Sequence, residues 1–171
     1  MLSKQIVDGI NEQVNQEFFA WYQYLQMAAW CEERNFPGFG AWLRMQASEE
    51  QSHAMRLYDF LLEWGASVEL KPLAEPKRDF ESHIEIFAHA LASEQKVGEQ
   101  VNNLYGMAFE EKAYAAHLQF QWFVTEQVEE VNTAEFVLDQ MKKAGDDTAA
   151  LLMLDRELGA RKAEADGAAE A

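Results

Sequence analysis

Apolar residues recur with a helical period in four long segments of the chain. Residues three and four positions apart share one face of an α-helix, so such stripes predict amphipathic helices. The first stripe comprises Ile6, Ile10, Val14, Phe18, Trp21, Leu25 and Ala28, and similar stripes cross residues 43–64, 84–101 and 120–141. One acidic residue interrupts each stripe, in order Glu17, Glu50, Glu94 and Glu130.

The residues between the stripes predict where the helices end. With Ser3 as a cap and Gly65, Gly106 and Gly145 as stop signals, we expect helices at about residues 3–34, 39–64, 80–105, 109–143 and 148–161, in a single domain of residues 1–171. Residues 66–78 form a long connection without helical periodicity. Short, long and short connections predict an all-α fold: an antiparallel four-helix bundle with one long crossover and a short fifth C-terminal helix.

The four acidic residues are spaced so that they meet at one level of this bundle. In an antiparallel hairpin, residues equidistant from the turn lie at the same height. The midpoint of Glu17 and Glu50 is position 33.5, and that of Glu94 and Glu130 is position 112. Both midpoints lie close to predicted turns, so all four carboxylates are expected roughly 25 Å up the bundle.

Such a cluster has the composition of a metal site. A buried ionised carboxylate must be neutralised, hydrogen-bonded or bound to metal. His53 follows Glu50 by three residues and shares its helix face. Carboxylates with one imidazole and no thiolate suit iron or manganese, and one glutamate can bridge two ions. Gln127 faces the same core and can hydrogen-bond a metal-bound water or oxygen species. The alternative is a metal-free acidic network, whose carboxylates would repel one another.

Composition limits the possible partners. The chain has 30 acidic residues against 14 Lys and Arg, which gives a formal charge of −16. This charge argues against nucleic-acid binding. It either attracts cations or serves solubility alone. The only cysteine, Cys31, forms no internal disulfide. Without a secretory signal or an apolar run of about 20 residues, we expect no membrane association. The expected location is the cytoplasm, or an organelle lumen if a presequence is removed.

At these residues the chain closely resembles the non-haem bacterial ferritins. The matching positions are Glu17, Tyr24, Glu49-Glu50-Gln51-Ser52-His53, Glu94 and Glu126-Gln127-Val128-Glu129-Glu130. The resemblance implies a ferritin-like fold with a first iron on Glu17, Glu50 and His53, and a second on Glu50, Glu94 and Glu130. It also implies a third iron site formed by Glu49, Glu126 and Glu129 together with Glu130. A solvated acidic face is the alternative for those three residues.

The resemblance further implies iron storage and detoxification. Two Fe(II) would be oxidised by O2 or H2O2 at the paired site, and the Fe(III) mineral would grow inside a homo-oligomeric shell of 24 subunits. Bacterioferritins carry a haem-ligating Met at the position of Gln51, so no haem is expected. Tyr24, and similarly Trp122, can supply an electron near the metals, or simply pack in the core. The last helix either packs at a symmetry axis of the shell or folds back onto its own bundle.

Two other functions fit the same residues. A di-iron oxidase or peroxide-scavenging enzyme would use the paired site without storing iron. A metal-free helical scaffold would use the bundle alone. The mass of the assembly separates a shell from a small enzyme, and retention of metal separates both from a scaffold.

Overall fold

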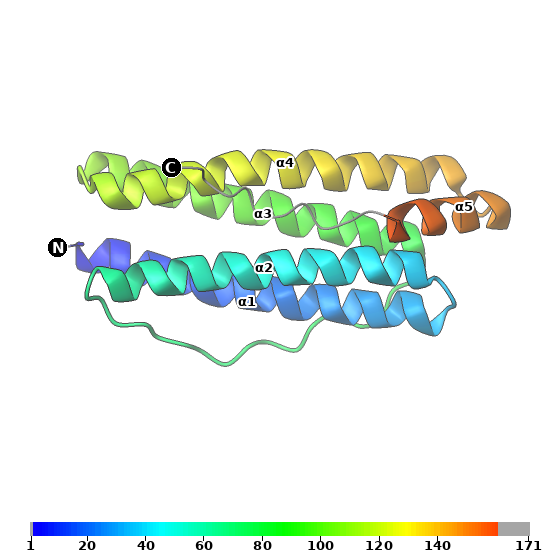
Figure 1. Cartoon of the computed structure of the whole chain (residues 1–171), viewed down its shortest axis with the longest axis horizontal. Helices are drawn as coiled ribbons and strands as arrows, with labels where there is room; N and C mark the ends of the chain where they lie inside the picture. Colours follow the sequence, from blue (N-terminus) through cyan, green and yellow to red (C-terminus); the bar gives the residue numbers. More distant parts are fainter. Residues whose placement is uncertain (1, 161–171) are drawn as a thin grey trace.

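Over the residues that the structure describes, the protein is an all-α bundle of four long helices and one short one, as the sequence predicts (Figure 1). The computed structural model describes residues 2–160. Its helices are α1 (Lys4–Glu33), α2 (Pro37–Glu63), α3 (His83–Glu110), α4 (Tyr114–Ala144) and α5 (Thr148–Gly159). The expected end of the last helix at residue 161, and the rest of the predicted domain up to residue 171, lie outside the described residues. Within the described part, no helix is long and apolar enough to cross a bilayer.

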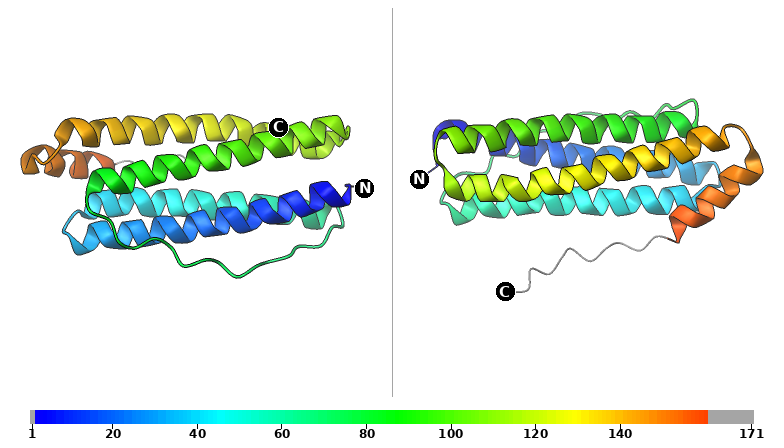
Figure 2. Two further views of the ribbon diagram at one scale, coloured as in Figure 1. Left: turned by 180° about the vertical axis from the view of Figure 1, so that it is seen from behind. Right: turned by 90° about the horizontal axis from the view of Figure 1, so that it is seen from above.

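The helices form two hairpins, α1 with α2 and α3 with α4, and a crossover joins them along the full length of the bundle (Figures 1 and 2). Three amide side chains of α1 fasten this crossover. Asn11 donates to the carbonyl of Ser67 and accepts from the amide of Glu69, at 3.0 and 2.7 Å. Asn15 and Gln23 make the same two-way contact further along, at 2.7–2.9 Å. The long connection is therefore ordered by hydrogen bonds that hydropathy does not reveal.

The turn between α3 and α4 lies further along the chain than the sequence predicts. We expected Gly106 to end the third helix, but α3 continues to Glu110 and the turn falls at residues 111–113. The helix continues because a glycine is tolerated within it and Ala108, two residues later, is fully buried in the core. Lys112 takes the left-handed conformation at the turn, with φ of 55°. This position coincides with the midpoint of Glu94 and Glu130.

The apolar core is divided into two clusters, one on each side of the acidic level. One cluster includes Met27, Phe39 and Phe87, towards the α5 end of the bundle. The other includes Ile10, Leu57 and Phe120, towards the opposite end. Packing on both sides fixes the height and rotation of all four long helices. The carboxylates are consequently positioned by the hydrophobic stripes that surround them.

The fifth helix packs back onto its own bundle through Asp155. This residue is 6% exposed, and its Oδ1 accepts from the backbone amide of Phe39 at 2.8 Å. Phe36, at the start of α2, provides no side-chain cap, so Asp155 caps α2 from a distant part of the chain. The two helices approach closely at glycines: a Cβ on Gly38 would lie 1.7 Å from the carbonyl oxygen of Asp155, and one on Gly159 would lie 2.8 Å from the Cα of Gly38.

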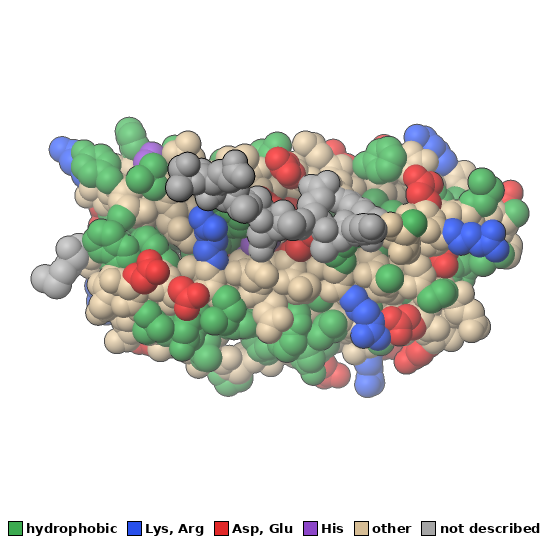
Figure 3. Space-filling view, in the orientation of Figure 1, with side chains coloured by type: hydrophobic (Ala, Val, Ile, Leu, Met, Phe, Trp, Pro, Cys, Tyr) green, Lys and Arg blue, Asp and Glu red, His purple; other side chains and the backbone are tan. Residues whose placement is uncertain are grey.

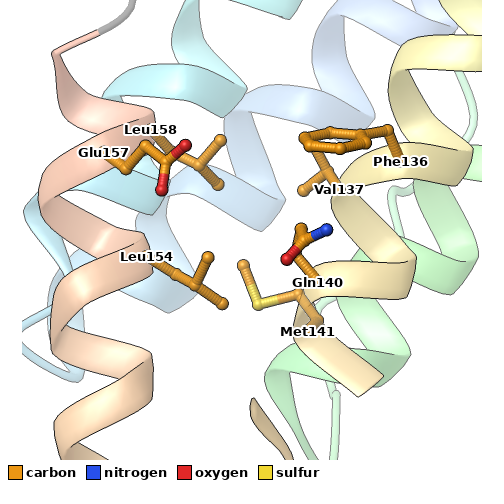
Figure 4. A pocket seen from close by; sticks show the side chains of 7 residues that line it. All are labelled: Phe136, Val137, Gln140, Met141, Leu154, Glu157 and Leu158. Atoms are coloured by element: carbon orange, nitrogen blue, oxygen red, sulfur yellow. The ribbon is translucent and has the colours of Figure 1, made fainter. Parts of the chain in front are cut away.

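The remaining surface of α5 is only partly covered. Leu154 and Leu158 line a small, mainly apolar pocket opposite Val137 and Met141 of α4 (Figure 4). Leu152 and Met153, by contrast, are 43% and 71% exposed. On the face seen in Figure 3, hydrophobic side chains reach the surface in several groups, with acidic and basic side chains scattered among them. The helix thus packs on its own bundle and part of its apolar surface stays open, while packing at a symmetry axis of a shell stays a prediction.

We expect Asp155→Ala to loosen α5, because it removes the cap of α2 and leaves the amide of Phe39 buried without an acceptor. The cost should be about 1–3 kcal/mol, whereas Asp155→Asn keeps an acceptor oxygen and should cost less. Hydrogen exchange of peptides covering residues 36–42 and 148–159 measures the effect. Equal exchange in Asp155→Ala and the unmodified protein would contradict this account of α5.

Candidate metal centre

Five ionisable side chains from all four long helices meet at the level between the two apolar clusters. They are buried to between 0% and 8% exposure, and comprise Glu17 from α1, Glu50 and His53 from α2, Glu94 from α3 and Glu130 from α4. Each glutamate occupies a core position of its helix stripe, and the stripe's apolar neighbours carry it inwards. The structure therefore brings together the four glutamates that interrupt the stripes and His53.

These side chains form two adjoining groups that share one glutamate. One group is Glu17, Glu50 and His53, and the other is Glu50, Glu94 and Glu130. Within each group, one ligand atom per residue lies within 4.8 Å of the others. This arrangement can hold two metal ions with Glu50 between them, because a carboxylate can give one oxygen to each ion. The assignment of these residues as ligands stays a prediction.

The histidine is held between the two hairpins. Its Nδ1 lies 3.6 Å from Oε2 of Glu50, and its Nε2 lies 3.9 Å from Oε1 of Glu130. Trp122 and Phe123 of α4 contact the ring edge-on, with centroid distances of 5.6 and 5.7 Å. The aromatic contacts limit rotation of the imidazole, so its nitrogen atoms stay directed at the carboxylates.

Hydrogen bonds orient two of the four carboxylates. Gln13 donates from Nε2 to Oε1 of Glu17 at 2.8 Å. Oε1 of Glu94 accepts from the hydroxyl of Tyr24, and Oε2 of Glu94 accepts from Nε2 of Gln127 at 2.8 Å. Gln127 also donates to the backbone carbonyl of Glu94, at 2.9 Å. Tyr24 and Gln127 thus both hold Glu94, whereas electron supply by Tyr24 and a hydrogen bond from Gln127 to a metal-bound water or oxygen species stay predictions.

The other two carboxylates lack such partners. Both oxygens of Glu50 and Oε2 of Glu130 are buried without a hydrogen-bond partner. Burial first, and then the charges of Glu94, Glu130 and Glu17, raise the pKa of Glu50 well above its ordinary value. Burial and the charge of Glu94 likewise raise the pKa of Glu130 well above its ordinary value. A divalent cation would relieve both the repulsion and the missing partners, so the residues present fit a metal ion bound by oxygen and nitrogen donors.

The residues expected to form a third site lie beside this centre and differ in placement. Glu126 is half-buried and forms a further group with His53 and Glu130, with one ligand atom per residue within 4.8 Å. Glu49 is half-buried, and its charge contributes to the raised pKa of Glu130. Glu129 is exposed and belongs to none of the ligand groups found among residues 2–160. The structure therefore places Glu126 beside the metal centre, whereas Glu129 lies outside the ligand groups of the described residues.

Sequence reasoning missed Gln13, although a signal was present. Gln13 lies four residues before Glu17 and is 2% exposed, so it is a second polar residue on the buried face of the same helix. It also missed Gly98 on α3. A Cβ at Gly98 would lie 3.0 Å from Cγ of Gln127, which explains why a residue without a side chain stands there.

Comparison with known proteins confirms the resemblance. Residues 7–144 match the ferritin family, described as a ferritin-like domain. The bacterial non-heme ferritin of Staphylococcus aureus (strain USA300) is 38% identical over 161 residues, which cover 94% of this chain and 97% of that protein. An open pore ferritin from the hyperthermophilic archaeon Archaeoglobus fulgidus is 36% identical, with a TM-score of 0.93, over 95% of this chain and 100% of the archaeal one. A humanized archaeal ferritin has a TM-score of 0.94 at 35% identity, over 96% of this chain and 100% of that chain.

We expect the metal-free protein to lose stability as the pH rises from about 4.5, the ordinary pKa of a glutamate, towards neutral, because the folded state favours protonated Glu50 and Glu130 while the unfolded chain releases those protons readily. Glu50→Gln keeps the shape of the side chain without its charge. It should raise the midpoint of thermal unfolding at the higher pH and reduce the pH dependence. Calorimetry after exhaustive chelation measures both effects, with Glu99→Gln, at an exposed position outside the ligand groups of the described residues, as the control. A Glu50→Gln protein less stable than the unmodified one at the higher pH would refute the predicted repulsion.

Proposed function

Because this chain belongs to the ferritin family, we propose that it stores iron, oxidising Fe(II) at the buried centre and keeping the Fe(III) product as a mineral inside a shell of many subunits. The observation that supports this most directly is the pair of ligand groups sharing Glu50. Fe(II) is the substrate here and the ferric mineral is the cargo.

The proposed reaction takes one electron from each of two Fe(II) ions bound side by side. One O2 accepts both electrons with two protons to give H2O2, or one H2O2 accepts them with two protons to give two waters. Glu17, Glu50 and His53 hold the first ion, and Glu50, Glu94 and Glu130 hold the second. Anionic oxygen ligands stabilise Fe(III) more than Fe(II), so they favour this oxidation.

The neighbouring residues have supporting roles in this proposal. Tyr24 and Gln127 keep Glu94 directed at the second ion through their hydrogen bonds to its two oxygens. Glu126, with Glu49 and Glu129, receives iron next to the centre, and the group of Glu126, His53 and Glu130 supports such a position. Burial and the nearby carboxylates raise the pKa of Tyr24 well above its ordinary value, so its hydroxyl remains a hydrogen-bond donor.

Storage requires assembly, which the surface of the subunit favours. Phe109, Tyr114, Leu118 and Met153 are 66–71% exposed. Large hydrophobic side chains at such exposure are typical of surfaces that associate. A formal charge of −16 per subunit attracts cations and repels anions. We propose that the protein forms a homo-oligomer of 24 subunits, which is the assembly that the resemblance to ferritins implies. We also propose that it is located in the cytoplasm and binds neither nucleic acid nor haem.

We expect rapid aerobic Fe(II) oxidation when two Fe(II) are added per subunit, followed by retention of far more iron than the centre can bind. Glu50→Ala should slow the initial oxidation by about 100-fold or more, since it removes a ligand of both ions. Stopped-flow absorbance measures the rate, and native mass spectrometry or light scattering measures the assembly.

Glu135→Ala is a suitable control, because Glu135 is exposed on α4 and belongs to none of the ligand groups in the described part of the chain. An unchanged initial rate in Glu50→Ala would refute the proposed centre. A monomer or dimer that oxidises Fe(II) without retaining it would instead identify a non-storing di-iron oxidase.

A further inference from the structure

Three of the four buried carboxylates, Glu50, Glu17 and Glu94, differ in how many of their oxygens accept a hydrogen bond from the protein. Glu50 has both oxygens without a hydrogen-bond partner. Glu17 has one engaged, because its Oε1 accepts from Gln13 while its Oε2 has no partner. Glu94 has a donor on each oxygen. Glu50, which the two ligand groups share, thus keeps both oxygens open, whereas Glu17, which belongs to one group only, keeps one open.

From this pattern we propose that Gln13 is a positioning residue of the first metal position, where it restricts Glu17 to binding through one oxygen. The proposal rests on the function proposed above and adds to it the residue that sets the geometry at one of the two ions. Gln13 touches neither ion and acts only through Glu17.

The surroundings of Gln13 suit this role. It is 2% exposed and lies one helical turn before Glu17 on the same face of α1, so the contact is fixed by the helix itself. Desolvation makes an amide-to-carboxylate hydrogen bond strong and costly to break. With Oε1 held, only Oε2 is free to face Glu50 and His53, whose ligand atoms lie within 4.8 Å. Gln127 is the counterpart on the other side, where it holds Glu94.

The two glutamines therefore hold carboxylates of different metal positions. Removing each glutamine in turn should affect one position and leave the other unchanged, which tests the proposal. Crystals and solutions of the assembled protein are titrated with Zn(II), which is not oxidised. Anomalous diffraction measures the occupancy of each position, and calorimetry measures the affinities. Gln13→Met removes the donor with little change in volume, and Gln127→Met does the same beside Glu94. Gln16→Met is the matched control, because Gln16 lies on the same helix and its Oε1 accepts from Nζ of Lys96 at 3.3 Å.

We expect Gln13→Met to weaken Zn(II) binding at the first position by about 10- to 100-fold and to change the second by no more than about twofold. Gln127→Met should give the reverse pattern, and Gln16→Met should change neither. With Co(II), Gln13→Met should also lower the visible molar absorbance, because Glu17 can then bind through both oxygens and raise the coordination number. The refined Zn(II) complex should show that two-oxygen contact directly.

Several results would overturn the proposal. Equal weakening at both positions would indicate a general structural role for Gln13, and no change at either would indicate no role. If Gln13→Met fails to assemble, Gln13→Asn replaces it, because the shorter amide no longer reaches Glu17 and the same selective loss is expected. If the unmodified protein binds Zn(II) at neither position, the proposed function itself fails. If it binds at both and Gln13→Met matches Gln16→Met, only the role of Gln13 fails.

Discussion

The cost of burying four carboxylates at one level of a helix bundle is the constraint on which the rest of the structure depends. Without a cation, these groups repel one another and leave several oxygens without partners. The two apolar clusters on either side hold the helices in the arrangement that imposes this cost. Repulsion among the buried carboxylates lowers the stability of the metal-free protein. Because a bound cation removes this repulsion, the same cost strengthens the binding of cations.

Polar side chains in the interior have distinct functions in this bundle. Asn11, Asn15 and Gln23 fasten the crossover to α1, and thereby fix how the second hairpin sits against the first. Gln13, on the same helix, contacts a carboxylate of the centre instead. Helix α1 therefore both binds the crossover and supports one side of the metal centre. Amide side chains on different faces of the helix make these two sets of contacts.

Asp155 illustrates how a distant segment completes a local structure. The N-terminus of α2 has a proline and two glycines but no side-chain cap of its own. Its cap comes from α5, more than a hundred residues later in the chain. Since α2 carries Glu50 and His53, docking of α5 contributes to holding the helix that supplies the shared ligand. The close approach at Gly38 and Gly159 makes this docking possible.

The sequence by itself determined the four long helices, the crossover and the level at which the glutamates meet, because all of these follow from helical periodicity and chain length. It misplaced the turn at Gly106, since a glycine alone does not end a helix whose next residues, such as Ala108, are buried. Only the tertiary structure decided that Gln13 holds Glu17, that Gln127 holds Glu94 and that Asp155 caps α2. Side-chain hydrogen bonds depend on rotamers and on which helices come together, and neither is encoded in a periodic pattern of hydropathy.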